Sequence, residues 1–82
     1  MSARSNQAHV RNPVLALPAM ACLMGMPQAM RAAFAEVLFD LGRDADRNAE
    51  KAWRTRKAPM AAYWRAVAVY ARHTARALRR AA

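Results

Sequence analysis

The 82-residue sequence predicts an all-α protein, an antiparallel helical hairpin of two long helices with a short N-terminal helix packed against it. Alanine and arginine are the commonest residues, and both favour helices. Aromatic residues make up only 7% of the chain and β-branched residues are few, which argues against an all-β fold. Apolar residues also recur at three- and four-residue spacing, as they do in amphipathic helices.

A chain of this length forms one small domain. Residues 1–12 are polar and aperiodic, so we expect an N-terminal tail there and a single helical domain over residues 13–82. Pro18 suits the first turn of a short helix over about residues 18–24, and Gly25 suits its end.

A long second helix is predicted over about residues 27–57, because Pro27 suits its first turn and an apolar stripe follows. Gly42 lies within the stripe and disfavours helix, so the sequence leaves open whether the helix is continuous there. The stripe consists of Met30, Phe34, Val37, Leu38, Leu41, Ala45, Ala49, Ala52 and Trp53.

A third helix is predicted over about residues 59–80. The residues predicted for its side of the seam alternate spacings of four and three, which is a heptad pattern. They are Met60, Trp64, Val67, Ala71, Thr74 and Leu78. The connection is short, so the two long helices must be antiparallel neighbours. Pairing Trp53 with Trp64 at the turn places Gly42 beside Ala75, with small residues along the middle of the seam.

The net charge of +9 is unevenly distributed along the chain. All five acidic residues fall within residues 36–50, whereas residues 51–82 carry nine basic residues and no acid. Arginine and alanine richness is also typical of GC-rich coding sequences, as in a high-GC bacterium or one of its phages. The basic charge alone therefore does not establish nucleic-acid binding.

We expect no enzymatic activity, cofactor or metal site. His9 and His73 lie in different predicted elements, and no glycine-rich loop precedes a helix. The acidic residues are spaced as helical partners of arginines, as Asp40 and Arg43 are. Cys22 is the single cysteine, so it forms no internal disulfide and lacks the spacing of metal ligands.

Our leading hypothesis is a protein–protein interaction module: an adaptor, an inhibitor or a small subunit of a larger assembly. The partner would be a second copy or another protein. A hairpin this small has difficulty burying all its large apolar side chains, and methionine is common at adaptable apolar contacts. The predicted interface residues are Met20, Met24, Met26, Met30, Phe34, Tyr63 and Tyr70.

Two alternatives remain open at this point. One is nucleic-acid binding, in which basic side chains contact phosphates; its residues would be Arg54, Arg56, Lys57, Arg72, Arg76, Arg79 and Arg80. The other is binding of the basic third helix to a membrane or granule surface. The longest apolar run, residues 14–27, is too short to span a bilayer, and we expect the protein to be cytoplasmic.

Overall fold

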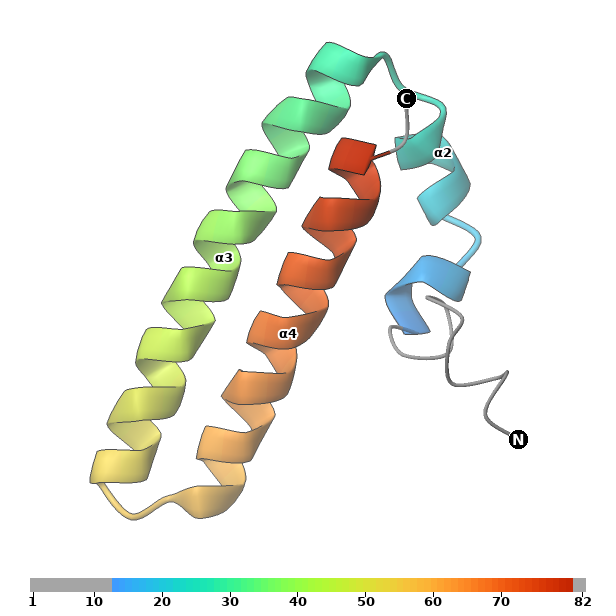
Figure 1. Cartoon of the computed structure of the whole chain (residues 1–82). Coiled ribbons are helices and arrows are strands. Elements are labelled where there is room, and N and C mark those ends of the chain that lie inside the picture. Colours follow the sequence, from blue (N-terminus) through green and yellow to red (C-terminus); the bar gives the residue numbers. More distant parts are fainter. Residues whose placement is uncertain (1–12, 81–82) are drawn as a thin grey trace.

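The computed structural model describes residues 13–80, which form helices and their connections without a strand. Two long antiparallel helices, α3 (Gln28–Arg54) and α4 (Ala58–Arg80), make a hairpin (Figure 1). A 3-10 helix, η2 (Pro13–Ala16), and a short α-helix, α2 (Met20–Met24), lie beside the C-terminal half of α4. The predicted all-α hairpin with a short N-terminal helix is confirmed.

The helices differ at their ends from the predicted ranges. α3 begins directly after Pro27 but ends three residues before the predicted residue 57, and α4 begins one residue earlier than predicted. α2 begins two residues later than predicted, and η2 was not predicted. The predicted tail over residues 1–12 lies outside the described residues.

α3 ends in a hydrogen-bonded turn that reverses the chain. The Lys57 amide donates to the Ala52 carbonyl (2.8 Å), and the Arg56 amide donates to the Trp53 carbonyl (3.1 Å). This pair of bonds is the Schellman motif, which requires a left-handed residue after the helix. Arg56 takes that conformation with φ of 62°, at a position that glycine usually occupies.

α3 is continuous through Gly42, which answers the question that the sequence left open. An added Cβ at Gly42 would lie 3.1 Å from Cγ of Arg72 and 3.4 Å from the carbonyl oxygen of Ala68. The first distance is shorter than most carbon contacts and the second is an ordinary van der Waals contact, so glycine permits the close approach of the two helices here.

The predicted register of the seam was wrong. Gly42 lies against Ala68 and Arg72, about one helical turn from the predicted neighbour Ala75. The prediction assumed that Trp53 and Trp64 pair at the turn, but Trp53 is 65% exposed. The tight turn is centred on residue 56. Each residue of α3 therefore faces a residue of α4 that lies a few positions closer to the connection than the pairing of the two tryptophans predicted.

Small residues fill the seam, and large apolar residues are buried only at its open end. There, α2 and η2 cover the hairpin, and a core forms around Met20, Ala35, Ala75 and Leu78. Val14, Leu15, Leu23, Leu38 and Phe39 pack against that core. The buried residues nearer the turn are smaller: Gly42, Ala45, Ala49, Ala52, Ala61 and Ala68. Hydrophobic stabilisation scales with buried apolar area, so it is concentrated at the open end.

Arg31 ties the three segments at the open end together. Its side chain is buried, with the residue only 7% exposed. Nε donates to the Leu78 carbonyl at 3.3 Å, and Nη1 donates to the carbonyls of Met26 (2.6 Å) and Met24 (3.5 Å). Leu78 lies in the last turn of α4 and Met24 ends α2, where carbonyls lack helical partners and attract positive charge. One guanidinium therefore caps the C-terminal ends of both α2 and α4.

Candidate protein-binding surface

Exposed apolar side chains form a stripe along α3. Met30, Phe34, Val37 and Leu41 follow one another at spacings of four, three and four residues, so they share one side of the helix. All four are exposed, and Val37 is the most exposed of them at 55%. Large apolar residues with this much exposure usually signal a contact surface when they are contiguous.

A second stripe runs along α4. Met60, Tyr63, Val67 and Tyr70 follow one another at spacings of three, four and three residues. Met60, Tyr63 and Tyr70 are exposed, with Tyr63 at 56%, and Val67 is half-buried. Seven of these eight side chains are therefore solvent-accessible, on two adjacent antiparallel helices.

Ion pairs between the helices mark the other side of the hairpin, which we call the ion-paired side. Asp46 on α3 accepts from Nη1 of Arg65 (3.0 Å) and of Arg72 (2.7 Å) on α4. Closer to the open end, Arg79 donates to Glu36 at 2.8 Å. These contacts fix which edge of each helix lies on that side.

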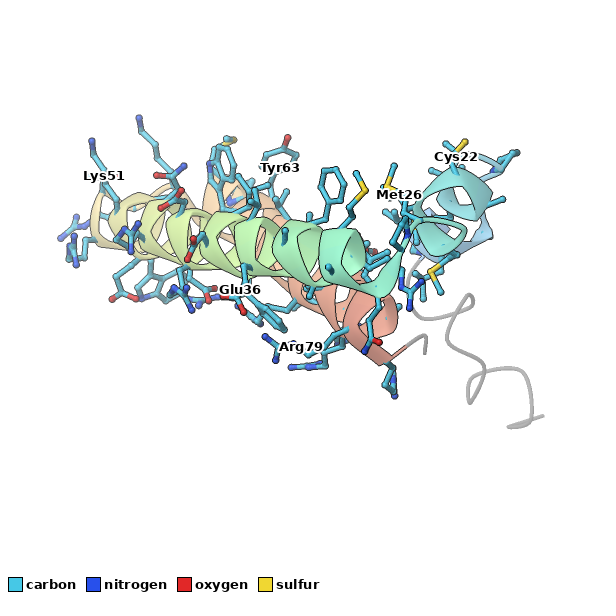
Figure 2. The ribbon with its side chains drawn as sticks, turned by 90° about the horizontal axis from the view of Figure 1, so that it is seen from above. Cys22, Met26, Glu36, Lys51, Tyr63 and Arg79 are labelled. Carbon is cyan, nitrogen blue, oxygen red and sulfur yellow. The ribbon has the colours of Figure 1, made fainter. Side chains whose placement is uncertain are left out.

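The two stripes lie together on the side opposite to the ion pairs. At about 100° per residue, Leu41 is rotated about 140° from Asp46 on α3, and Tyr63 about 160° from Arg65 on α4. Figure 2 shows Tyr63 and Met26 on one side of the ribbon and Glu36 and Arg79 on the other. We call the surface formed by the two stripes the apolar face; it consists of Met30, Phe34, Val37, Leu41, Met60, Tyr63, Val67 and Tyr70.

The structure distributes the predicted interface residues over three environments. Met30, Phe34, Tyr63 and Tyr70 come together on the apolar face. Met20 is buried in the chain's own core, so it is unavailable to a partner. Met24 is exposed at the end of α2, and Met26 is half-buried in the connection that follows.

Sequence reasoning missed four members of the apolar face: Val37, Leu41, Met60 and Val67. They were assigned to the stripes that would form the seam. The apolar arc on α3 is wider than a seam of small residues needs, and this width could have indicated a second apolar surface. A helical wheel drawn separately for the alanines and for the large residues would have shown two adjoining stripes.

The predicted nucleic-acid residues do not form one surface. Arg54, Arg56 and Lys57 lie at the turn, and Arg76, Arg79 and Arg80 lie at the other end of a helix about 35 Å long. Arg72 and Arg79 instead bond across the hairpin to Asp46 and Glu36 of α3. The Arg79 guanidinium also lies 4.8 Å from the centre of the Phe39 ring.

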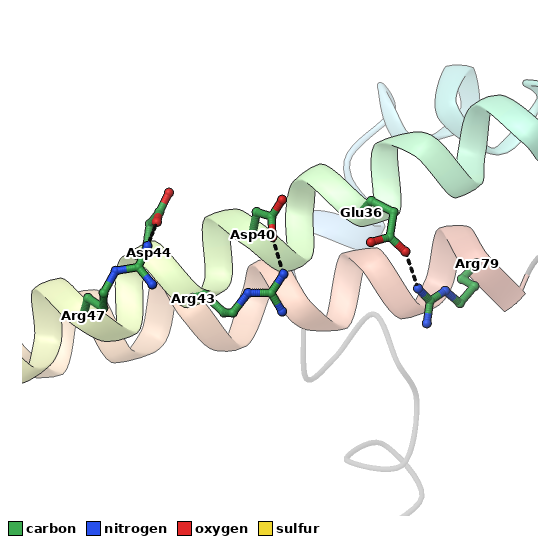
Figure 3. A network of polar contacts seen from close by, with 6 residues as sticks. All are labelled: Glu36, Asp40, Arg43, Asp44, Arg47 and Arg79. Carbon is green, nitrogen blue, oxygen red and sulfur yellow. Dashed lines mark hydrogen bonds and ion pairs between the residues drawn. The ribbon is translucent and has the colours of Figure 1, made fainter.

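Two further acids of α3 pair within their own helix. Asp40 accepts from Arg43 and Asp44 accepts from Arg47, as Figure 3 shows together with the Glu36–Arg79 pair. Both intrahelical pairs are exposed, so each contributes little to stability. Over residues 13–80, no three histidine, cysteine or acidic side chains are placed so as to hold a metal ion.

The ion pairs of Asp46 make the stability of the hairpin depend on pH. The hydrogen bond from Arg72, with the positive charges of Arg72 and Arg65, holds the pKa of this carboxyl below its usual value. A lowered folded-state pKa stabilises the fold above the unfolded-state pKa of about 3.9, and this contribution disappears as the pH falls through the folded-state value.

Asp46→Asn should therefore lower the urea midpoint at pH 7, and its difference from the wild type should shrink below about pH 4. Urea titrations from neutral to acidic pH measure this, and a difference that persists unchanged in acid would contradict it.

The turn of the hairpin carries a pocket of about 220 Å³. Ala52, Met60 and Trp64 supply its apolar lining, while Lys51, Lys57, Thr55 and Asn48 supply polar groups. Met60 belongs to both the pocket and the apolar face, and the Trp64 ring meets Tyr63 edge-on at 5.1 Å. The pocket is therefore continuous with the apolar face.

None of the helices between residues 13 and 80 is long and apolar enough to cross a membrane. Comparison of the chain with protein-family models, with curated proteins and with solved structures finds no match.

Proposed function

We propose that this protein is a helical protein–protein interaction module that binds its partner through the apolar face. The observation that carries the proposal is the separation of the two sides of the hairpin. Seven of the exposed large apolar side chains of α3 and α4 gather on one side, while the ion pairs between the helices lie on the other. The exception is Trp53 at the end of α3, which is exposed on the side of Asp46. Burying such a face against a second chain removes apolar area from water, the main favourable term in protein association.

The composition of the apolar face supports the same function. Tyrosine, phenylalanine and methionine are enriched in the cores of protein interfaces, and charged residues are depleted there. The face holds two tyrosines, a phenylalanine and two methionines, and its eight members include no charged residue. The proposal assigns no catalytic step to the protein and places it in the cytoplasm, where the free, exposed thiol of Cys22 suits a reducing environment.

The arginines of α4 support this function over nucleic-acid binding. Arg72 and Arg79 are engaged with Asp46 and Glu36, so their charges are partly neutralised within the hairpin. Binding to a phosphate backbone depends on uncompensated positive charge. If these two arginines have a structural role, the basic residues that remain for nucleic-acid binding form two separate groups, one at each end of α4.

Site-specific photocrosslinking in an extract of the source organism tests the proposed function. A photoreactive residue at Val37 or Tyr63 should give a discrete crosslinked product, because both side chains would lie inside the interface. The matched control places the same residue at Arg43 or Arg47, which are equally exposed but lie away from the apolar face. Equal crosslinking from both pairs of positions, or none from Val37 and Tyr63, would contradict the proposal.

A further inference from the structure

We propose that the partner is an acidic amphipathic segment of another protein, with a carboxylate next to an apolar side chain that enters the pocket at the turn. This inference rests on the proposed function and adds that the partner carries negative charge. The chain has two lysines, Lys51 and Lys57, and both line this pocket. The two lysines share the lining with the apolar residues Ala52, Met60 and Trp64.

The charge around the pocket is positive, and no acidic residue among residues 13–80 lines the pocket. Lys51, Arg54, Arg56 and Lys57 fall within seven residues, and no acid follows Glu50 in the chain. The first turn of α4 carries no acidic residue either. By contrast, the acids Glu36 and Asp46 are engaged by arginines on the ion-paired side. An incoming carboxylate is the group that complements this end of the apolar face.

The backbone at the turn is consistent with selection for positive charge. Arg56 occupies a left-handed position that glycine would adopt without strain. Non-glycine residues in such conformations are often kept for a function of their side chain. Together, the two lysines and Arg56 place positive charge beside an open pocket at one end of the exposed apolar face.

The charge also argues against a second copy as the occupant. Two chains of net charge +9 repel each other, and each would bring the same lysines to the contact. An amphipathic helix laid along the two stripes, with acidic residues at the end near the turn, satisfies both the apolar face and the lysines.

Binding of synthetic helical peptides to the full chain tests the inference. The probe is a peptide with leucines at helical spacing and glutamates elsewhere, and its controls carry glutamine or lysine in place of glutamate. In a Trp53→Phe background, Trp64 is the one remaining tryptophan, so its emission reports on the pocket. We expect the acidic peptide to shift the Trp64 emission and to bind about tenfold more tightly than the glutamine peptide.

Variants separate this inference from the proposed function. Lys51→Gln with Lys57→Gln should weaken acidic-peptide binding by about three- to tenfold, since each exposed ion pair contributes modestly. The control, Arg76→Gln with Arg80→Gln, removes the same charge from exposed positions at the far end of α4 and should bind nearly as the wild type does. An equal loss of peptide affinity in the two variants would show that the lysine pocket does not bind the carboxylate, and would overturn the inference. Unchanged binding in Phe34→Ser with Leu41→Ser would instead overturn the apolar face. Self-association through this face in sedimentation velocity, without peptide binding, would identify a second copy as the occupant and overturn the inference alone.

Discussion

Replacement of Arg31 by methionine is expected to destabilise the protein by about 3 kcal/mol, because buried hydrogen bonds from a charged donor are strong and their loss leaves carbonyls unpaired. Methionine keeps most of the side-chain volume but cannot donate to the carbonyls of Leu78, Met24 and Met26. A domain of this size has a total unfolding free energy of roughly 4–12 kcal/mol, so the loss is a large fraction of it. The melting temperature, followed by circular dichroism, should fall by about 12–24 °C.

Two further variants make the Arg31 prediction specific. Arg31→Lys keeps the charge and should recover part of the stability, since an ammonium can donate to carbonyls but lacks the planar geometry of the guanidinium. Arg47→Met removes an exposed arginine whose pair with Asp44 lies within one helix, and should change stability by less than about 0.5 kcal/mol. If Arg31→Met is as stable as Arg47→Met, the buried guanidinium contributes nothing to the fold.

Gly42→Leu should have a comparable effect, about 3 kcal/mol or more, because it inserts atoms into a seam that is already closed. Even a Cβ at this position would lie 3.1 Å from Cγ of Arg72. The remaining atoms of leucine would have to separate α3 from α4 or displace the Arg72 side chain from Asp46. Chemical denaturation at neutral pH measures the loss, and a stability equal to that of the wild type would show that the helices do not approach closely here.

Gly42→Ala isolates the contact with Arg72. Alanine gains about 1 kcal/mol of helix propensity over glycine, which opposes the cost of the close Cβ contact. In an Arg72→Ala background the Cγ is absent, so Gly42→Ala should stabilise the protein by about 1 kcal/mol. In the wild-type background the same change should give a smaller gain or a loss. Identical effects in the two backgrounds would contradict the contact, since double-mutant cycles detect such coupling.

The helical hairpin could be predicted because its determinants are local. Pro27 precedes α3, and three residues, Thr55 to Lys57, connect it to α4. The register could not be predicted in the same way. Aromatic residues usually mark a core, and that expectation paired Trp53 with Trp64, whereas the helices meet through alanines and Gly42. Trp53 therefore lies outside the seam, while Trp64 is half-buried beside the pocket at the turn.

The candidate surface was predictable only in part, for a geometric reason. The apolar arc of α3 serves both the seam and the apolar face, and the sequence does not say which half α4 covers. Val37 and Leu41 were therefore placed in the seam although both are exposed. Arg31 escaped notice because its partners are main-chain carbonyls, which leave no trace in residue types or spacing. The ion pairs of Asp46 likewise depend on the register.

The Arg31 contacts also bear on how this sequence can diverge. Every amino acid presents the same main-chain carbonyl, so these hydrogen bonds place no demand on the side chains of the residues that accept them. Met24, which is exposed, can therefore drift freely in descendants of this gene as far as the contact is concerned. Position 31 has no such freedom, because only arginine offers several donors in one plane. Among distant descendants whose surface residues have been exchanged, we expect an arginine four residues after the proline that precedes α3 to be among the last features lost.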